Sequence, residues 1–283
     1  MTLRICPECN NDMRVSRTTC PHCGRPQFFP NVDIANSSVE VDKLNLRYDA
    51  GKEECNGRGQ SGLFERFEAT CEASAAVFAC SLQKLNREVA TGTELFDTFF
   101  DLERLRLQSS TPGDFDWRKL RPQAEIELLG SHDHLDKIHY ACLSLDWASL
   151  TNYGDCFVKL SEPMIAHRAT CFEGNTAVIY AVDRDFKNYL RCGWSRRGKI
   201  ACAVFSKKLT AGISESEFAS LLVKACPESE NDEFIEVHVF GAMSARTFSE
   251  VRFDTSKHSR SDSVYRKAVE AKLRSAGVSV SIA

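Results

Sequence analysis

The stretch FIEVHVFG, residues 234–241, decides the fold of the second half of the chain. Its side chains alternate between the two faces of an extended strand, a period of two that is typical of β-structure. One face carries Ile235, Val237 and Val239, and the other carries Glu236, His238 and Phe240. A half-buried strand would leave Glu236 in water, but Phe240 shares its face and the neighbouring candidate strands are apolar. The question is whether Glu236 is a solvated carboxylate or one held in a cleft for chemistry.

Short apolar alternations surround this stretch and predict a sheet. The expected strands cover residues 124–129, 138–145, 155–160, 176–182, 188–194, 199–205, 233–240 and 247–253. Helices are expected within SESEFASLLVKA and near 262–275, with no regular alternation of strand and helix. This pattern predicts an α+β domain over residues 111–283, built on a mostly antiparallel sheet or split β-sandwich with helices, with its boundary between 108 and 122.

The region before this domain has a different character. Residues 27–60 are rich in Asn, Ser, Gly and charge, and we interpret them as a linker. Residues 61–110 are expected to form a helical hairpin, because apolar residues recur at helical spacing and Thr91 and Glu94 form a capping box before a second helix. The mainly apolar stripe is Leu63, Phe67, Cys71, Ser74, Phe78, Leu82, Leu85 and Val89. Such a stripe packs as core or binds a partner, so the hairpin is a candidate for homo-oligomer formation.

Composition restricts the possible classes of protein. The chain has 283 residues, 43% hydrophobic and 27% charged, which is typical of a globular protein. Its net charge of -3 gives no overall attraction to nucleic acid. No apolar run reaches the roughly 18 residues that a membrane helix needs, and MTLRICPEC lacks the apolar core of a signal peptide. We therefore expect a cytoplasmic protein with no membrane partner.

Four of the 13 cysteines are paired by spacing near the N-terminus. Cys6 and Cys9 form one C-P-x-C knuckle, and Cys20 and Cys23 form a second. Four thiolates at this spacing suit tetrahedral zinc, so residues 1–26 are expected to form a zinc ribbon that takes its folding energy from the metal. The other nine cysteines are scattered, as expected of small apolar residues in a reducing compartment.

Three segments of the second half together carry a family resemblance. They are YGDCFVKL, then HRATCFEGNT, then the late strand FIEVHVFG followed by ARTFSEVRF. In this combination, residues 123–283 resemble the mono-ADP-ribosyltransferase superfamily. The resemblance implies an enzyme that cleaves NAD between nicotinamide and ribose and transfers ADP-ribose to a macromolecular acceptor.

The resemblance assigns roles to five residues. Glu236 would be the catalytic carboxylate that stabilises the positive ribosyl centre, and Tyr153 would support the nicotinamide. His139, or in second place Arg168, would hold NAD, and Ser144 is the alternative to Tyr153.

This chain departs from the arginine-modifying members of the superfamily. They carry Glu or Gln two residues before the catalytic Glu, where this chain has Phe234. The departure implies either that the acceptor is nucleic acid or a protein side chain other than arginine, as in a toxin or defence effector, or that the domain has lost transferase activity.

Two other classes of function fit parts of the sequence. A non-catalytic zinc-ribbon module could bind nucleic acid or protein through the basic segment SRRGKIACAVFSKK, which contains Arg196, Arg197, Lys199, Lys207 and Lys208. A metal-dependent hydrolase could use the H-x-H-x-D stretch formed by His132, His134 and Asp136.

Overall fold

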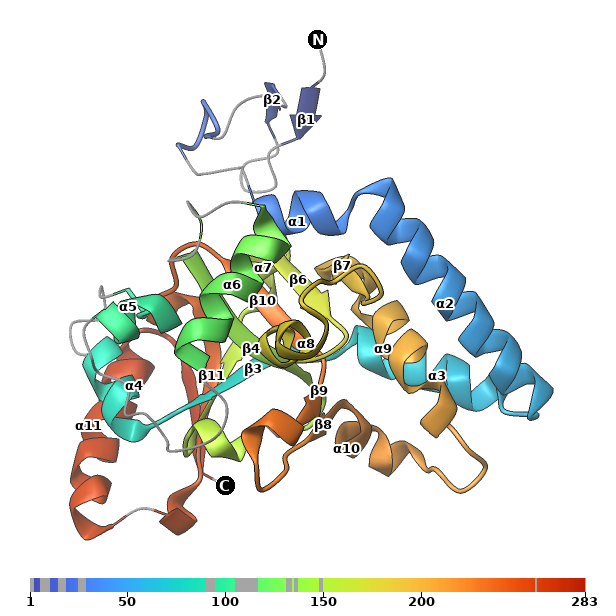
Figure 1. Ribbon diagram of the computed structural model, residues 1–283. Coiled ribbons are helices and arrows are strands. Elements are labelled where there is room, and N and C mark those ends of the chain that lie inside the picture. Colours follow the sequence, from blue (N-terminus) through green and yellow to red (C-terminus); the bar gives the residue numbers. More distant parts are fainter. Residues whose placement is uncertain are drawn as a thin grey trace.

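A computed structural model gives the arrangement of the chain (Figure 1). It describes residues 3–5, 11–14, 19–24, 29–89, 95–104, 117–130, 134, 137–147, 150–257 and 259–282. In this part of the chain none of the helices has the length and apolar character that crossing a membrane requires.

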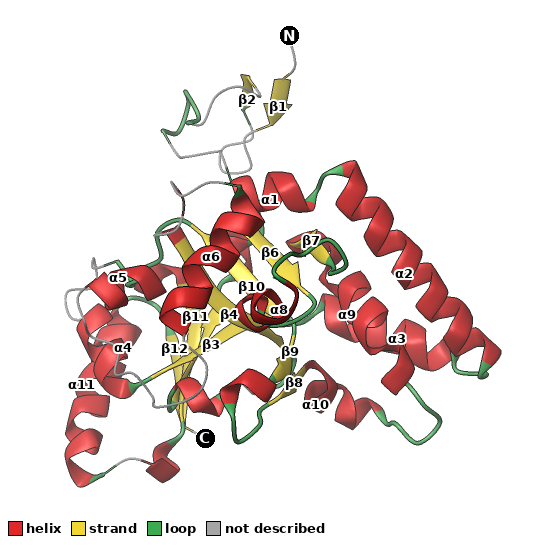
Figure 2. Ribbon diagram, in the orientation of Figure 1, coloured by secondary structure: helices red, strands yellow, loops and turns green. Residues whose placement is uncertain are grey.

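An eight-stranded sheet forms the centre of the molecule (Figure 2). In spatial order its strands are β12 (Ser279–Ile282), β11 (Phe248–Phe253), β5 (Cys156–Leu160), β3 (Ala75–Cys80), β4 (Ile138–Ser144), β10 (Glu236–Phe240), β6 (Ala169–Phe172) and β7 (Arg191–Gly193). Every neighbouring pair is antiparallel except β11 and β12, which are parallel. The expected α+β class with a mostly antiparallel sheet is therefore confirmed, but the eight strands form one sheet and not a split β-sandwich.

Helices cover both faces of this sheet (Figure 1). They are α1 (Pro30–Ala35), α2 (Ser38–Gly57), α3 (Ser61–Glu72), α4 (Leu82–Glu88), α5 (Phe99–Arg104), α6 (Trp117–Leu129), α7 (Glu162–Ile165), α8 (Thr176–Asp183), α9 (Arg197–Phe205), α10 (Phe218–Leu222) and α11 (Arg260–Ser275). Helices α6 and α8 lie together over β4, β10 and β6, while α2, α3 and α9 form a separate group beside the β7 end of the sheet.

Strand β10 shows why both faces have to be covered. All five of its residues are buried, as the alternating sequence and the apolar neighbours predict. Val237 and Val239 belong to the main core, together with residues of α3, α4, α9 and α11. Phe240, on the opposite face, packs with residues of α6 in a second, smaller core. Glu236 and His238 share this second face, so α6 and α8 enclose them.

The structure corrects the expected architecture of the N-terminal half. Residues 27–60 contain α1 and the 20-residue helix α2 instead of a linker. Residues 61–110 contain α3, β3, α4 and α5 instead of a helical hairpin. Because β3 pairs with β4 and β5, the sheet extends across the expected boundary near 108–122. The apolar stripe is buried, but it belongs to three elements of the core, which removes the basis for an oligomer through a hairpin.

Three expected strands are helices. Residues 124–129 lie in α6, residues 176–182 in α8 and residues 199–205 in α9. In α8, the side chain of Asn175 accepts hydrogen bonds from the backbone N–H groups of Ala177 and Val178, at 3.1 and 3.4 Å. This N-cap starts a helix that the β-branched composition of the segment disfavours. Tertiary context thus overrides local strand propensity.

The N-terminal segment holds a small antiparallel pair, β1 (Leu3–Ile5) with β2 (Asp12–Arg14), which projects beyond α1 in Figure 1. Cys6 and Cys9 lie outside the described residues. The second knuckle is described: the backbone N–H of His22 contacts Sγ of Cys20 at 3.4 Å, and that of Gly24 donates to the carbonyl of Cys20 at 2.9 Å. Gly24 has φ of 70°, which favours glycine. This turn suits a metal-binding thiolate at Cys20.

Candidate functional site

Glu236 lies in the interior, at the first position of β10, and is 2% exposed. Its Oε2 atom accepts three close hydrogen bonds, from the backbone N–H of Thr176 at 2.8 Å, from the Thr176 hydroxyl at 2.6 Å and from Nε2 of His238 at 3.0 Å. Its Oε1 atom lies 3.1 Å from Nη1 of Arg121. One oxygen is therefore fixed by the sheet and α8, and the other faces a cation.

The local fold explains why Thr176 reaches Glu236. Strand β6 pairs with β10, and the chain then turns at Asn175 into α8, whose first residue is Thr176. The first N–H groups of a helix have no partner within the helix and carry its positive dipole end. The N–H of Thr176 points at the carboxylate, so α8 stabilises a negative charge on Glu236.

Arg121 comes from α6 and closes the site. Its Nη1 donates to the Thr176 hydroxyl at 2.8 Å and its Nη2 to Oδ1 of Asn175 at 3.2 Å. Its guanidinium carbon lies 4.2 Å from the centre of the Tyr140 ring, a cation–π distance. The side chain is only 8% exposed, so a full guanidinium charge is buried beside the carboxylate.

These contacts determine the ionisation of the site. Burial alone would raise the pKa of Glu236, but Arg121, His238 and the Thr176 hydrogen bond outweigh it and lower the pKa to about 2. Glu125 of α6, which is fully buried, behaves in the opposite way: burial raises the pKa of its carboxyl, and His238 and Arg121 offset this only in part. Two neighbouring carboxyls are thus driven apart in pKa, a feature typical of functional sites.

Two residues of the predicted site share the environment of Glu236. Ser144 continues the alternation of Tyr140 on the same face of β4, and its buried hydroxyl has no hydrogen-bond partner among the residues that the structure describes. Tyr153 is 44% exposed. Burial raises the pKa of its hydroxyl to about 12, the charge of Arg121 opposes this rise, and Asp232 and Glu236 add to it. Tyr153 is therefore near enough to Arg121 and Glu236 to feel both charges.

The two predicted NAD-holding residues lie elsewhere. His139 pairs with Val239, so it points to the face of the sheet opposite Glu236, where burial, Lys84 and Arg168 lower its pKa to about 3. Arg168 donates from Nη1 to the carbonyls of Phe240 and Ala242, at 2.9 and 2.8 Å, beyond the other end of β10. It fixes a turn, and neither residue converges on Glu236. Placing them beside the carboxylate was wrong.

Sequence reasoning missed most of the groups that surround Glu236. They are Arg121, Glu125, Tyr140, Asn175, Thr176 and His238. The signal for two of them is present in FEGNT, where Asn-Thr directly after a strand marks a helix N-cap. No pattern links α6 to β10, because the contact spans 115 residues.

The structure does not support a metal site at the H-x-H-x-D stretch. His132 and Asp136 lie outside the described residues, and His134 lies edge-on to Phe240 with ring centres 5.6 Å apart. Among the residues that the structure describes, no group of three His, Cys, Asp or Glu side chains could hold a metal ion.

The basic segment does not form one cationic surface. Arg197 is buried and pairs with Glu162 at 3.0 Å, whereas Lys208 pairs with Glu233. Arg196 donates to Asn36 and Lys199 to Asn45, so these cations are directed to different parts of the molecule.

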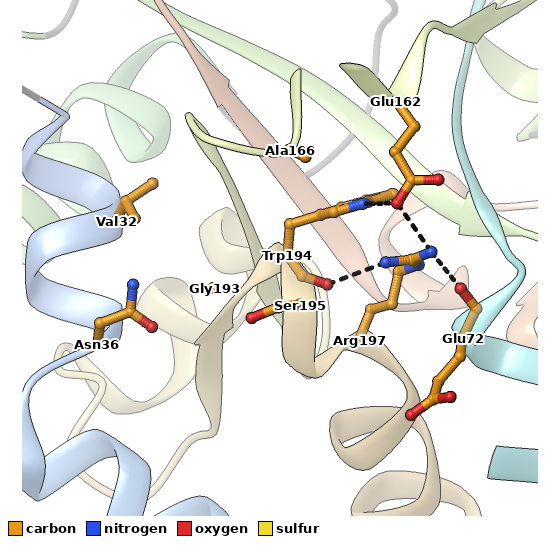
Figure 3. A pocket seen from close by; sticks show the side chains of 9 residues that line it. All are labelled: Val32, Asn36, Glu72, Glu162, Ala166, Gly193, Trp194, Ser195 and Arg197. Atoms are coloured by element: carbon orange, nitrogen blue, oxygen red, sulfur yellow. Dashed lines mark hydrogen bonds and ion pairs between the residues drawn. The ribbon is translucent and has the colours of Figure 1, made fainter. Parts of the chain in front are cut away.

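A separate pocket of about 480 Å³ lies between α1, α7 and the start of α9 (Figure 3). Figure 3 shows Val32 of α1 and Asn36, the C-cap residue of that helix, on one side and Trp194 with Arg197 on the other. The Arg197 guanidinium lies 4.5 Å from the centre of the Trp194 ring, and Glu162 accepts hydrogen bonds from both side chains. Most of the polar side chains that line this pocket therefore form hydrogen bonds or ion pairs with one another or with the rest of the protein.

Comparison with known proteins leaves the site to be interpreted from its own geometry. Neither a scan of protein families nor a search of curated proteins finds a match to this chain.

Proposed function

We propose that the chain is an ADP-ribosyltransferase-like enzyme that uses NAD, with Glu236 as its charge-stabilising carboxylate. The observation that carries this proposal is the state of Glu236: it is buried yet ionised, with a pKa lowered to about 2. Three hydrogen bonds fix Oε2, and Oε1 faces a positive group. A preorganised anion in a dry site is what stabilisation of a cationic transition state requires.

The chemistry follows from this arrangement. The bond between the nicotinamide nitrogen and ribose C1′ breaks, and its electron pair leaves with nicotinamide. Positive charge develops on the ribosyl centre, and the carboxylate of Glu236 stabilises it more strongly in the transition state than in the substrate. A nucleophilic atom of the acceptor then bonds to C1′ and loses its proton to solvent.

Tyr153 and Ser144 are the supporting groups in this proposal. Ser144 offers a buried hydroxyl that has no hydrogen-bond partner among the described residues, on the face of the sheet that carries Glu236, and the partly exposed Tyr153 would support the nicotinamide. The zinc ribbon, held by Cys6, Cys9, Cys20 and Cys23, would select the acceptor, a nucleic acid or a protein side chain other than arginine. Such an enzyme would act as a toxin or defence effector within the cytoplasm.

One observation favours a second candidate, a non-catalytic zinc-ribbon module that binds nucleic acid or protein. Glu236 is enclosed, and Arg121 satisfies it as in a structural ion pair. In that case the eight-stranded domain is a scaffold and the ribbon carries the binding.

The test compares wild type with Glu236→Gln and a matched control, Glu40→Gln. Glu40 is also buried and also paired with an arginine, Arg191, at 2.8 Å, but it lies on α2. Consumption of NAD and transfer of labelled ADP-ribose are measured with mixed nucleic acid and protein as acceptors. The transferase proposal expects turnover in wild type and Glu40→Gln, and a loss of about 100-fold or more in Glu236→Gln.

Equal losses in both variants would indicate a general effect of instability. A wild-type protein that neither binds nor consumes NAD would leave the binding module as the function.

A further inference from the structure

The guanidinium of Arg121 occupies a cage whose walls come from three other elements. The carboxylate of Glu236 lies on one side, at 3.1 Å, and the ring of Tyr140 lies across its face, at 4.2 Å. Thr176 Oγ1 and Asn175 Oδ1 accept hydrogen bonds at its edge, at 2.8 and 3.2 Å. An anion, an aromatic face and two edge acceptors are the set that a flat, delocalised cation requires.

The walls of this cage are fixed by bonds that do not involve Arg121. Asn175 is fixed by capping α8. Thr176 is fixed to Glu236 through its N–H and hydroxyl groups. The hydroxyl of Tyr140 donates to Glu125 at 2.9 Å. Removal of the Arg121 side chain would therefore leave a formed, negatively charged space in the interior.

We infer that this cage is a binding site for planar organic cations, and that Arg121 fills it as an internal ligand in the described state. A flat cation can stack on Tyr140 and still direct N–H or C–H groups toward Glu236. A compact ammonium ion cannot satisfy the ring face and the edge acceptors together. A free ligand enters only when the side chain of Arg121 leaves the cage, so Arg121 competes with any cation for the cage.

The inference extends the function proposed above, and it rests on that function only for the identity of the natural ligand. If the chain uses NAD, the positively charged pyridinium ring is the planar cation that displaces Arg121. The cage itself requires no enzymatic activity. The two ideas can therefore fail separately.

The experiment is chemical rescue of the full-length Arg121→Ala variant. We expect this variant to melt several degrees below wild type, because Glu236 loses its buried counter-ion. Millimolar methylguanidinium or N-methylpyridinium should raise its melting temperature by several degrees, and the same salts should leave wild type unchanged. Tetramethylammonium at equal ionic strength, which is not planar, should be effective only at about tenfold higher concentration, if at all.

The matched control is Arg121→Ala combined with Glu236→Gln, which removes both charges. Rescue should disappear in this double variant, since the cage has lost its anion. If Arg121→Ala does not fold alone, its soluble yield is compared with and without methylguanidinium during refolding, and recovery should again require Glu236.

Two results would overturn the inference: no response of Arg121→Ala to any planar cation, or an equal response in the double variant. Turnover of NAD is assayed in parallel. If a planar cation restores the stability of Arg121→Ala but no variant turns over NAD, the cation-binding cage is supported and the transferase proposal is contradicted. Turnover that falls on removal of Arg121, while a planar cation still raises the melting temperature, would make Arg121 a positioning residue and would exclude the pyridinium of NAD as the occupant, but the cage would remain.

Discussion

Nδ1 of His238 lies 4.0 Å from Oε2 of Glu125, and both atoms are buried without a hydrogen-bond partner among the described residues. The other ring nitrogen, Nε2, contacts the ionised Glu236, so we assign the imidazole proton to Nε2. His238 thus lies between an ionised carboxylate and a carboxyl whose pKa is raised by burial. The two carboxyls therefore have opposite effects on stability as pH changes: the contribution of Glu236 is lost as pH falls, and that of Glu125 is lost as pH rises.

Glu125→Gln should remove a loss of stability that occurs as pH rises. The folded pKa of Glu125 is above its unfolded value, so its contribution is complete below the unfolded pKa of about 4.3 and is lost as pH rises through the folded pKa. His238, Arg121, Glu236 and Tyr140 face this carboxyl and stay in place in the variant. Urea unfolding from pH 4 to 8 should show a smaller decline for the variant. Parallel curves for both proteins would contradict the assignment.

Glu236→Gln should make the free energy of unfolding depend less on pH in the acid range. The folded pKa of about 2 is below the unfolded value, so the stabilisation is present above the unfolded pKa and is lost as pH falls toward 2. A shift of this size corresponds to roughly 3 kcal/mol. At neutral pH the variant should also lose about 3 to 5 kcal/mol, because the buried guanidinium of Arg121 loses the carboxylate that faces it.

His139→Gln tests whether this histidine holds NAD or only fills the main core. Its folded pKa of about 3 is below the unfolded value, so wild type loses stability as pH falls from about 6.5 toward 3. The variant should lose less over this range, by an amount on the order of 5 kcal/mol at the acid end. NAD binding, measured by calorimetry, should be the same in both proteins. Weaker binding in the variant would return His139 to the site.

Gly154→Ala should destabilise the fold. Gly154 has φ of 151°, and an added Cβ would lie 2.1 Å from the carbonyl carbon of Cys80. Backbone atoms of the strand end cannot move aside as a flexible side chain can, so a loss of several kcal/mol is expected. Gly212→Ala is the control, since a Cβ there meets nothing within 4 Å. Thermal melting should separate the two variants clearly.

One zinc ion per chain is expected from Cys6, Cys9, Cys20 and Cys23. Cys20→Ser should lose the metal while the eight-stranded domain keeps its melting transition, because none of the described residues of segment 1–26 belongs to the main core. Cys226→Ser, a half-buried cysteine outside the knuckles, is the control and should retain zinc. Metal analysis showing two zinc ions would instead support a second site at His132 and His134.

The sequence predicts strands well where alternation is strong, but it missed the 20-residue helix α2 and the strand β3. Strands β4, β5, β10 and β11 lie where alternation predicts them. AAVFAC, residues 75–80, continues a helical stripe in sequence, yet it forms β3 in the middle of the sheet. Its apolar residues are buried in either conformation, so burial alone could not distinguish helix from strand.

The sequence predicts the buried carboxylate of the candidate site, Glu236, but it does not predict the guanidinium that pairs with it, Arg121. The position of Glu236 follows from the alternation of FIEVHVFG, since a central strand buries both faces. Arg121 lies just before residues 124–129, which the sequence predicts to be a strand and which are part of α6. Only the contact of Arg121 with β10 reveals its role. Long-range ion pairs leave no periodic signal in a single sequence.

The place of β3 has a consequence for synthesis on the ribosome. The residues of β4 and β5 that pair with it follow it by 65 to 82 residues, and β3 separates these two strands in the finished sheet. While these partners are still being translated, β3 presents two unpaired edges with apolar side chains on both faces, a template for aggregation. A nascent chain that stalls before residue 156 would need a chaperone to shield this strand, and a fragment that starts at residue 110 would lack the strand that joins the two halves of its sheet.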